Sequence, residues 1–317
     1  MVHSAWIARR SVLSGRPDTV VAGQRLSSAA TGWFGRYGST MKDLSHVDGR
    51  LAGIGLWLRA PGPHDGAKGI LERAITAAQA ADRAGLRSLW VSESDVEGPT
   101  GAPYEAYSLL GALAVKTEQV HLGVVADRME RRAPSILAKI VTGVDVISHG
   151  RALLTLDADS SDDADIERLT EALVVCRAVL EDDLPTWSGQ HYAVEGAVNR
   201  PAPVQAGGVP LVVCLRGNGP WSSGLVSAIS GRADVVVVDG GADRVVEAVR
   251  LLGEGVDQST SDVVTGVLGQ VAIEAGLDAA SATSGLAEMR AAGASGCLIG
   301  VPFPWDTAII GDPALTW

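Results

Sequence analysis

The chain has 317 residues, of which 46% are hydrophobic and 20% are charged, a composition typical of a globular protein with a large core. Its formal net charge of −11 repels polyanions, and no dense Lys/Arg cluster offsets it, so we expect no nucleic-acid partner. No apolar run approaches the roughly 18 residues of a membrane-spanning helix, so we expect no membrane partner either.

Three cysteines, Cys176, Cys214 and Cys297, lie far from one another in apolar stretches. No pair has the spacing of a metal site or a redox motif, and an odd count argues against a disulfide framework. The simplest interpretation is buried, reduced thiols, which predicts a cytoplasmic protein.

Residues 1–50 show no sustained hydrophobic period, and no apolar segment follows Arg9 and Arg10 as it would in a signal peptide. We expect an N-terminal extension that is disordered or that reflects a start site assigned too far upstream, with Met41 as the alternative start. The fold is expected to begin at Leu51 and to continue to residue 317.

Apolar runs and helical periods alternate over the rest of the chain. The expected strands are 53–57, 88–92, 120–126, 152–156, 210–215, 233–238, 265–273 and 296–301. The expected helices are one capped by Asp65 and ended by Gly85, followed by 104–117, 135–148, 164–181, 222–231, 242–252 and 278–292. Most strands are continuous Val/Leu/Ile runs, as in parallel sheets buried on both faces.

Eight such strands predict an α/β fold, a (β/α)8 TIM barrel. The Pro- and Gly-rich segment 185–210 is too long for a plain loop, so we expect an excursion between barrel strands 4 and 5. An open doubly wound sheet is the alternative, but the Gly-x-Gly-x-x-Gly signature after its first strand is absent.

Three stretches resemble the luciferase-like monooxygenase superfamily, which includes bacterial luciferase-type enzymes and oxidoreductases that use the deazaflavin coenzyme F-420. They are AADRAGLRSLWVSES (80–94), RRAPSILAKIVTGVDVISHGR (131–151), and WSGQHY (187–192) followed by RPAPVQAGGVPLVV (200–213). The stretches occur in the family's order over residues 53–301.

This resemblance implies an oxidoreductase or monooxygenase that acts on a small organic substrate. It implies FMN or coenzyme F-420 at the carboxyl ends of the strands, and the residues leave the choice between the two open. Dimers are usual in the family, so the resemblance also implies a homodimer, which no residue pattern here tests.

The end of the third strand is the first predicted cofactor site. The family uses the backbone here to support the ring system, which places the ring against Val124, Val125 and Ala126. An ordinary buried strand end is the alternative interpretation.

The loop after the fifth strand is the predicted phosphate site. Glycines allow close approach of the backbone, and free N–H groups at a helix N-terminus bind phosphate. The resemblance assigns this role to Arg216, Gly217, Asn218 and Gly219, with Asp239 and Gly240 after the sixth strand as a weaker candidate. By itself, such a glycine pattern is more typical of a turn.

The predicted catalytic residues are Glu93, after the second strand, and His64, on the first βα loop. Many relatives carry a His directly after the matching Glu, whereas Ser94 and Asp95 follow it here. His64 is the His at the correct end of the barrel that could replace that missing imidazole. An exposed turn histidine is the alternative interpretation of His64.

The segment 157–163 is short and acidic where relatives have a Gly-rich loop that helps to hold the phosphate. Like charges about 4 Å apart cost roughly 1 kcal/mol in water and about 4 kcal/mol at a partly buried site. A calcium loop is not expected, because its sixth position is Asp162 and its twelfth is Arg168, so we predict no metal.

The acidic segment and the missing His leave a second function open. A non-catalytic paralog would keep the barrel as a binding or subunit partner after losing its cofactor. An unrelated hydrolase or aldolase barrel is disfavoured, because no Lys ends a strand and no metal-ligand cluster is present.

Overall fold

The computed structural model describes residues 51–61, 69–92, 104–125, 132–158, 162–205, 208–216, 220–254, 266–272, 279–310, 312 and 315–317. The chain divides into two compact units, Met1–Met41 and Lys42–Trp317. The first unit lies outside the described residues, so the predicted boundary between extension and barrel at Leu51 stays a prediction.

Eight parallel strands form one sheet that curls into a barrel. They are β1 (Gly53–Leu58), β2 (Ser88–Ser92), β3 (His121–Val125), β4 (Leu154–Ala158), β7 (Leu211–Leu215), β8 (Val235–Val238), β9 (Gly266–Ala272) and β10 (Gly296–Val301). Their order in the sheet is β3-β2-β1-β10-β9-β8-β7-β4. Leu122 joins the two edges, because its N–H donates to the Arg151 carbonyl and its carbonyl accepts from the Leu153 N–H, both at 2.8 Å. The predicted barrel is therefore confirmed.

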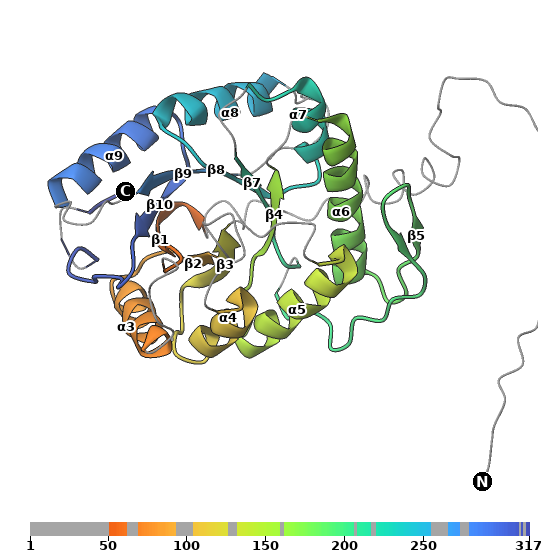
Figure 1. Cartoon of the computed structure of the whole chain (residues 1–317), viewed down its shortest axis with the longest axis horizontal. Helices are drawn as coiled ribbons and strands as arrows, with labels where there is room; N and C mark the ends of the chain where they lie inside the picture. Colours follow the sequence, from red (N-terminus) through yellow and green to blue (C-terminus); the bar gives the residue numbers. More distant parts are fainter. Residues whose placement is uncertain are drawn as a thin grey trace, which may run out of the picture. The chain divides into compact units, whose positions relative to one another are not determined.

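Helices cover the outside of the strands, as Figure 1 shows. They are α3 (Ile70–Arg83), α4 (Ala106–Ala114), α5 (Pro134–Ile147), α6 (Asp163–Glu181), α7 (Ser223–Ile229), α8 (Ala242–Glu254) and α9 (Ala279–Ala291). Each helix packs on the strands through an apolar face. In α3 this face is a buried stripe at helical spacing, formed by Ala74, Ala77, Ala78 and Ala81. No helix in the described ranges is long and apolar enough to cross a membrane.

Strand residues alternate between two separate apolar clusters, as the period of a β-strand requires. Leu56 and Leu58 pack outward against the helices, whereas Trp57 between them faces the barrel interior. The interior cluster comprises Leu51, Trp57, Trp90, Val125, Leu153, Val212, Cys214, Val235, Val237, Leu268 and Leu298. The interior is thus filled with side chains, as in other eight-stranded barrels.

Two glycines make room for the two interior tryptophans. A Cβ on Gly123 would lie 2.6 Å from the Trp90 ring, and a Cβ on Gly300 would lie 2.7 Å from the Trp57 ring. Each indole N–H is also satisfied by a serine of β2, Ser88 for Trp90 at 2.8 Å and Ser92 for Trp57 at 2.6 Å. Large aromatic rings and small partners therefore pack together across neighbouring strands.

The three cysteines are all buried and form no disulfide. Burial raises the pKa of the Cys297 thiol to about 12, so this group stays protonated at neutral pH. The prediction of buried thiols is confirmed.

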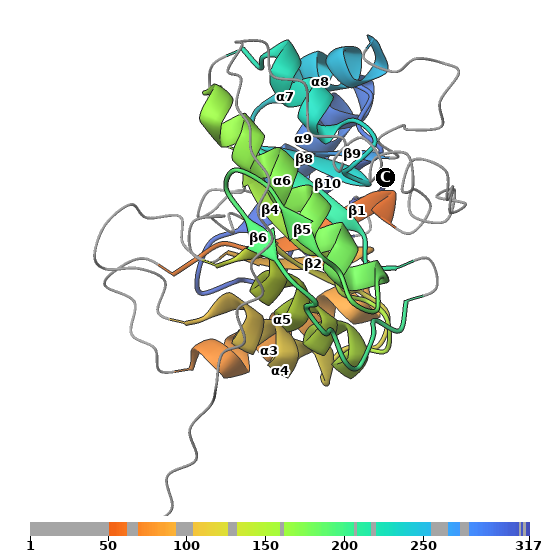
Figure 2. The same cartoon turned by 90° about the vertical axis from the view of Figure 1, so that its right-hand side faces the viewer.

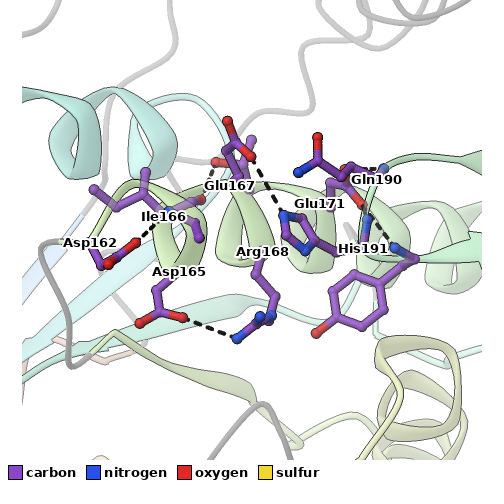
Figure 3. Close-up of polar contacts among 11 residues, drawn as sticks. Asp162, Asp165, Ile166, Glu167, Arg168, Glu171, Gln190 and His191 are labelled. Carbon is purple, nitrogen blue, oxygen red and sulfur yellow. Dashed lines mark hydrogen bonds and ion pairs between the residues drawn. The ribbon is translucent and has the colours of Figure 1, made fainter.

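The predicted excursion contains a short antiparallel hairpin of β5 (Trp187–Ser188) and β6 (Ala193–Val194), which lies beside α6 (Figure 2). The Glu171 carboxylate on α6 fixes it by accepting the backbone N–H groups of Gln190, His191 and Tyr192 at 2.6, 2.9 and 2.9 Å (Figure 3). A Cβ at position 189 would lie 2.3 Å from that carboxylate, so a larger residue there would require the Glu171 side chain to move.

A polar network holds the amino-terminal face of the barrel. Asp145, which is fully buried, accepts from the Val204 N–H at 2.8 Å and from the Gln205 side-chain amide at 2.7 Å. The Arg151 guanidinium donates to the carbonyls of Ala114, Thr117 and Val120 at 2.9, 2.9 and 2.7 Å, which satisfies the carboxyl end of α4. These contacts tie the excursion and α4 to the start of β4.

Asp82 anchors the turn before β3 to the carboxyl end of α3. Its carboxylate accepts the backbone N–H groups of Glu118, Gln119 and Val120 at 2.9, 2.8 and 3.0 Å. Burial alone would raise the pKa of Asp82, but these three hydrogen bonds and the nearby Arg151 lower it below its ordinary value.

We expect Asp82→Asn to lower the free energy of unfolding by about 2 kcal/mol at pH 7, because hydrogen bonds to an ionised group are replaced by weaker ones. A carboxylate whose pKa is lowered on folding stabilises the protein above its unfolded pKa, and this contribution disappears as the pH falls through its folded pKa. The difference between variant and wild type in urea unfolding should therefore shrink between pH 7 and pH 3. Glu72→Gln, an exposed change on the same helix, is the control and should cost less than about 0.5 kcal/mol. A difference that stays constant with pH would contradict the assignment.

Candidate functional site

The carboxyl ends of all eight strands meet at one end of the barrel, where such folds bind their ligands. We call the inward-facing residues there the barrel mouth: Trp57, Ser92, Val125, Asp157, Arg216, Asp239 and Gln270. They come from β1, β2, β3, β4 and β9 and from the residues directly after β7 and β8. The mouth is therefore built from segments that are far apart in the sequence.

The mouth has an apolar side on β1 to β3. Trp57 is 8% exposed and Val125 is 5% exposed, and the indole of Trp57 is oriented by its hydrogen bond to Ser92. Arg59, the next inward-facing position, places its guanidinium carbon 5.8 Å from the centre of the Trp57 ring. This side of the mouth is therefore apolar and aromatic.

The opposite side of the mouth is occupied by an ion-paired group that we call the Arg216 clamp: Asp157, Arg216 and Asp239. The Arg216 guanidinium donates to the Asp157 carboxylate at 3.3 Å and lies 3.7 Å from the Asp239 carboxylate. The backbone positions it, since the Arg216 N–H donates to the Ala158 carbonyl and the Asp239 N–H donates to the Leu215 carbonyl, both at 2.9 Å. The hydrogen-bond pattern of the parallel sheet therefore continues to Arg216 and Asp239.

Asp157 corrects the sequence interpretation of the acidic segment. The predicted fourth strand ended at 156, but β4 runs to Ala158, so Asp157 belongs to the strand and is 6% exposed. Pairing with Cys214 on β7 holds it in the ladder, and its inward orientation is compensated by Arg216. A strand tolerates an inward carboxylate here because a cation from the neighbouring strand meets it.

The rest of the acidic segment caps α6. Asp162 accepts the Ala164 N–H at 2.8 Å as the N-cap, and Asp165 pairs with Arg168 at 3.0 Å (Figure 3). Acidic residues in the first turn also complement the helix dipole. This part of the segment therefore caps the helix.

Two buried polar side chains face the interior without a partner in the part of the chain that the structure describes. Gln270 on β9 is 7% exposed, and neither its amide nitrogen nor its carbonyl oxygen makes a hydrogen bond to a described residue. The hydroxyl of Thr155 on β4 is fully buried and likewise makes no hydrogen bond to a described residue. Such groups are costly unless something satisfies them, so each calls for an explanation.

Five of the predicted site residues lie among the described residues. Val125 faces the barrel interior, whereas the side chain of Val124 packs outward against the helices, so that only its backbone faces inward. Arg216 and Asp239 belong to the clamp. Gly240 has φ 152°, and a Cβ there would lie 2.8 Å from the Arg244 side chain, so its glycine identity has a structural reason.

The remaining predicted residues lie outside the described residues: Glu93, His64, Ala126, Gly217, Asn218 and Gly219. Their assigned roles stay predictions. No group of three or more His, Cys, Asp or Glu in the described ranges has a geometry that could hold a metal ion.

Residues 54–294 match the model of the family described as luciferase-like monooxygenase. The chain belongs to this family. The match covers most of the barrel and includes the three stretches on which the resemblance was based. No curated protein matches the sequence.

Solved structures of the luciferase-like type share the fold. An F-420-dependent secondary alcohol dehydrogenase in complex with an F-420–acetone adduct is 17% identical with a TM-score of 0.63, over 83% of this chain and 99% of that one. The F-420-dependent tetrahydromethanopterin reductase of Methanopyrus kandleri is 14% identical with a TM-score of 0.63, over 82% and 96%. The oxygenating constituent of 3,6-diketocamphane monooxygenase of Pseudomonas putida, in complex with FMN, is 17% identical with a TM-score of 0.57, over 71% and 68%. At these identities the likeness establishes the fold.

The residues of the mouth fit the ring of a flavin-type cofactor but not its phosphate. The aromatic side and the buried Gln270 amide suit an uncharged ring with hydrogen-bonding edges. Arg216 does not suit a phosphate, because two carboxylates already lie within 4 Å of its guanidinium. A phosphate at this point would be repelled by about 1 to 4 kcal/mol per carboxylate contact.

Sequence reasoning missed three residues of the mouth: Trp57, Ser92 and Gln270. The sequence predicts them only as parts of strands, because a strand pattern does not reveal which face meets a ligand. One signal was present: Gln270 is a polar residue inside the apolar run GVLGQVA, which a buried strand rarely carries without a reason.

We expect Arg216→Met to lower the free energy of unfolding by about 2 to 3 kcal/mol, because it leaves the buried Asp157 carboxylate without this cation. The double variant Asp157→Asn/Arg216→Met should recover at least about 1 kcal/mol of that loss in urea unfolding. Asp239→Asn is the matched control, and its half-exposed carboxylate should contribute less than about 1 kcal/mol. If the losses in unfolding free energy for Asp157→Asn and Arg216→Met simply add up in the double variant, Asp157 and Arg216 are not coupled and the assignment is contradicted.

Proposed function

We propose that this chain is an oxidoreductase that binds a flavin-type ring, an isoalloxazine or a deazaflavin, at the barrel mouth and acts on a small organic substrate. Membership of the luciferase-like family supports the reaction class, and the solved neighbours include an F-420 adduct and an FMN complex. The observation that carries the proposal is the pairing of an aromatic wall with a buried, unsatisfied amide at the carboxyl ends of the strands. A bound ring would supply the hydride or oxygen chemistry.

The protein's own residues would bind and orient. We propose that the ring lies against Val125 and Ala126 and that the backbone of the 217–219 loop approaches the ligand's side chain. Glu93 and His64 remain the proposed acid–base residues at the rim of the mouth. The apolar interior beneath Trp57 would keep water from the underside of the site.

The primary test is ligand binding. Riboflavin, FMN and F-420 are titrated separately against the purified protein, and ligand and tryptophan fluorescence are followed. We expect saturable one-to-one binding of at least one ring below about 100 µM, with quenching of Trp57 because it lies at the mouth. Trp57→Leu should reduce affinity at least tenfold, whereas Trp317→Leu, at the far end of the chain, should leave it unchanged. No binding of any of the three rings would rule out the proposed function.

A second test concerns the proposed acid–base residues. Glu93→Gln and His64→Gln should each lower turnover at least tenfold while ring affinity changes less than twofold, since general acid–base catalysis typically contributes roughly 10²- to 10⁴-fold. Activity measured against a panel of small alcohols and ketones with the bound ring provides the readout. If both variants keep wild-type turnover, these assignments are wrong.

A non-catalytic paralog is the second candidate, and the Arg216 clamp favours it. An Arg216 that is already paired with two carboxylates would contribute little affinity for the phosphate of a cofactor. In this case the barrel would serve as a binding or subunit partner. Buried free thiols agree with a reducing, cytoplasmic location for either candidate.

A further inference from the structure

The geometry points to a mouth that selects a ring ligand without a phosphate group: the Arg216 clamp repels phosphate and Gln270 holds the polar edge of an uncharged isoalloxazine-type ring. This inference rests on the proposed function and narrows its ligand class. It follows from two independent features of the mouth. The Arg216 clamp opposes an anion, and the buried Gln270 amide has no hydrogen-bond partner among the described residues.

The clamp opposes an anion because its cation is already engaged. Arg216 is 26% exposed and bridges the carboxylates of Asp157 and Asp239, at 3.3 and 3.7 Å. A phosphate that approached this guanidinium would come within a few ångströms of two negative groups. One such repulsive contact lowers affinity by roughly a factor of ten to a thousand, depending on how well water screens it.

Gln270 lies beside the clamp. Val237 on β8 pairs with Leu268 on β9, and both face the interior. Asp239 and Gln270 each follow two residues later, so the period of the strand puts them on the same inner face at the same level. The Gln270 amide is more than nine-tenths buried, and within the described ranges it has no hydrogen-bond partner.

A primary amide offers one donor and one acceptor about 2 Å apart. The pyrimidinedione edge of an isoalloxazine or deazaflavin ring carries an N–H next to carbonyl oxygens, which is the complementary pattern. The Trp57 indole, which is 8% exposed, adds an apolar aromatic side chain to the same end of the barrel, and such side chains suit contact with a ring. An uncharged ring can therefore form hydrogen bonds with the buried amide. Because the ring carries no charge, the carboxylates of the clamp do not repel it.

Riboflavin and FMN form a matched pair, because they differ only in the phosphate. Both are titrated against the full-length protein by calorimetry and flavin fluorescence. We expect riboflavin to bind at least tenfold more tightly than FMN at low ionic strength, with the ratio falling as salt screens the repulsion. Tighter binding of FMN than of riboflavin would overturn this inference and leave the proposed function standing. Absence of binding by either, and by F-420, would remove both.

Two variants assign the selection to its residues. Asp157→Asn/Asp239→Asn frees Arg216 from its carboxylates, so FMN affinity should rise at least tenfold while riboflavin affinity changes less than threefold. Gln270→Leu should weaken riboflavin at least tenfold without lowering the melting temperature, because the buried amide makes no contact that the apolar side chain would lose. Unchanged riboflavin affinity in Gln270→Leu would show that a buried water, and not the ring, satisfies the amide, and would overturn the role of Gln270. Gln270→Glu, of the same length, removes the amide donor and adds a negative charge, so it should weaken both ligands, and FMN more than riboflavin.

Discussion

Closure of eight parallel strands into a barrel is the constraint on which the rest of the structure depends. It brings every strand's carboxyl end to one face and forces successive residues to point alternately inward and outward. Trp57, Asp157 and Gln270 share the mouth for this reason alone, since no local feature of the sequence connects them. The two glycines opposite the interior tryptophans make this closure sterically feasible.

The two ends of the barrel carry different tasks. The amino-terminal face is held by Asp82, Asp145, Arg151 and Gln205, all of which satisfy backbone groups at helix ends and turns. These residues lie within the stretches that identify the luciferase-like family. These four residues stabilise the scaffold, and a shared scaffold does not by itself specify the chemistry at the opposite end.

The barrel mouth combines an ion-paired side with an aromatic side. A guanidinium held between two carboxylates is well suited to fix the positions of three neighbouring strand ends, but it is poorly suited to receive a phosphate. The aromatic side and the unsatisfied amide argue for a ligand of a different charge. The proposed ring site is compatible with a paired Arg216, because Trp57 and Gln270 lie on other strands than Asp157 and the residues of the clamp that follow β7 and β8.

The sequence by itself determined the number of strands, their parallel arrangement, the excursion before the fifth barrel strand and the family. These follow from local patterns: buried Val/Leu/Ile runs, helical stripes, and short motifs such as WSGQHY at 187–192. Only the tertiary structure decided that β4 extends to Ala158, that Asp157 meets Arg216, and that Gln270 faces the interior without a partner. The physical reason is that charge compensation and burial are properties of side chains brought together across strands, which no one-dimensional period records.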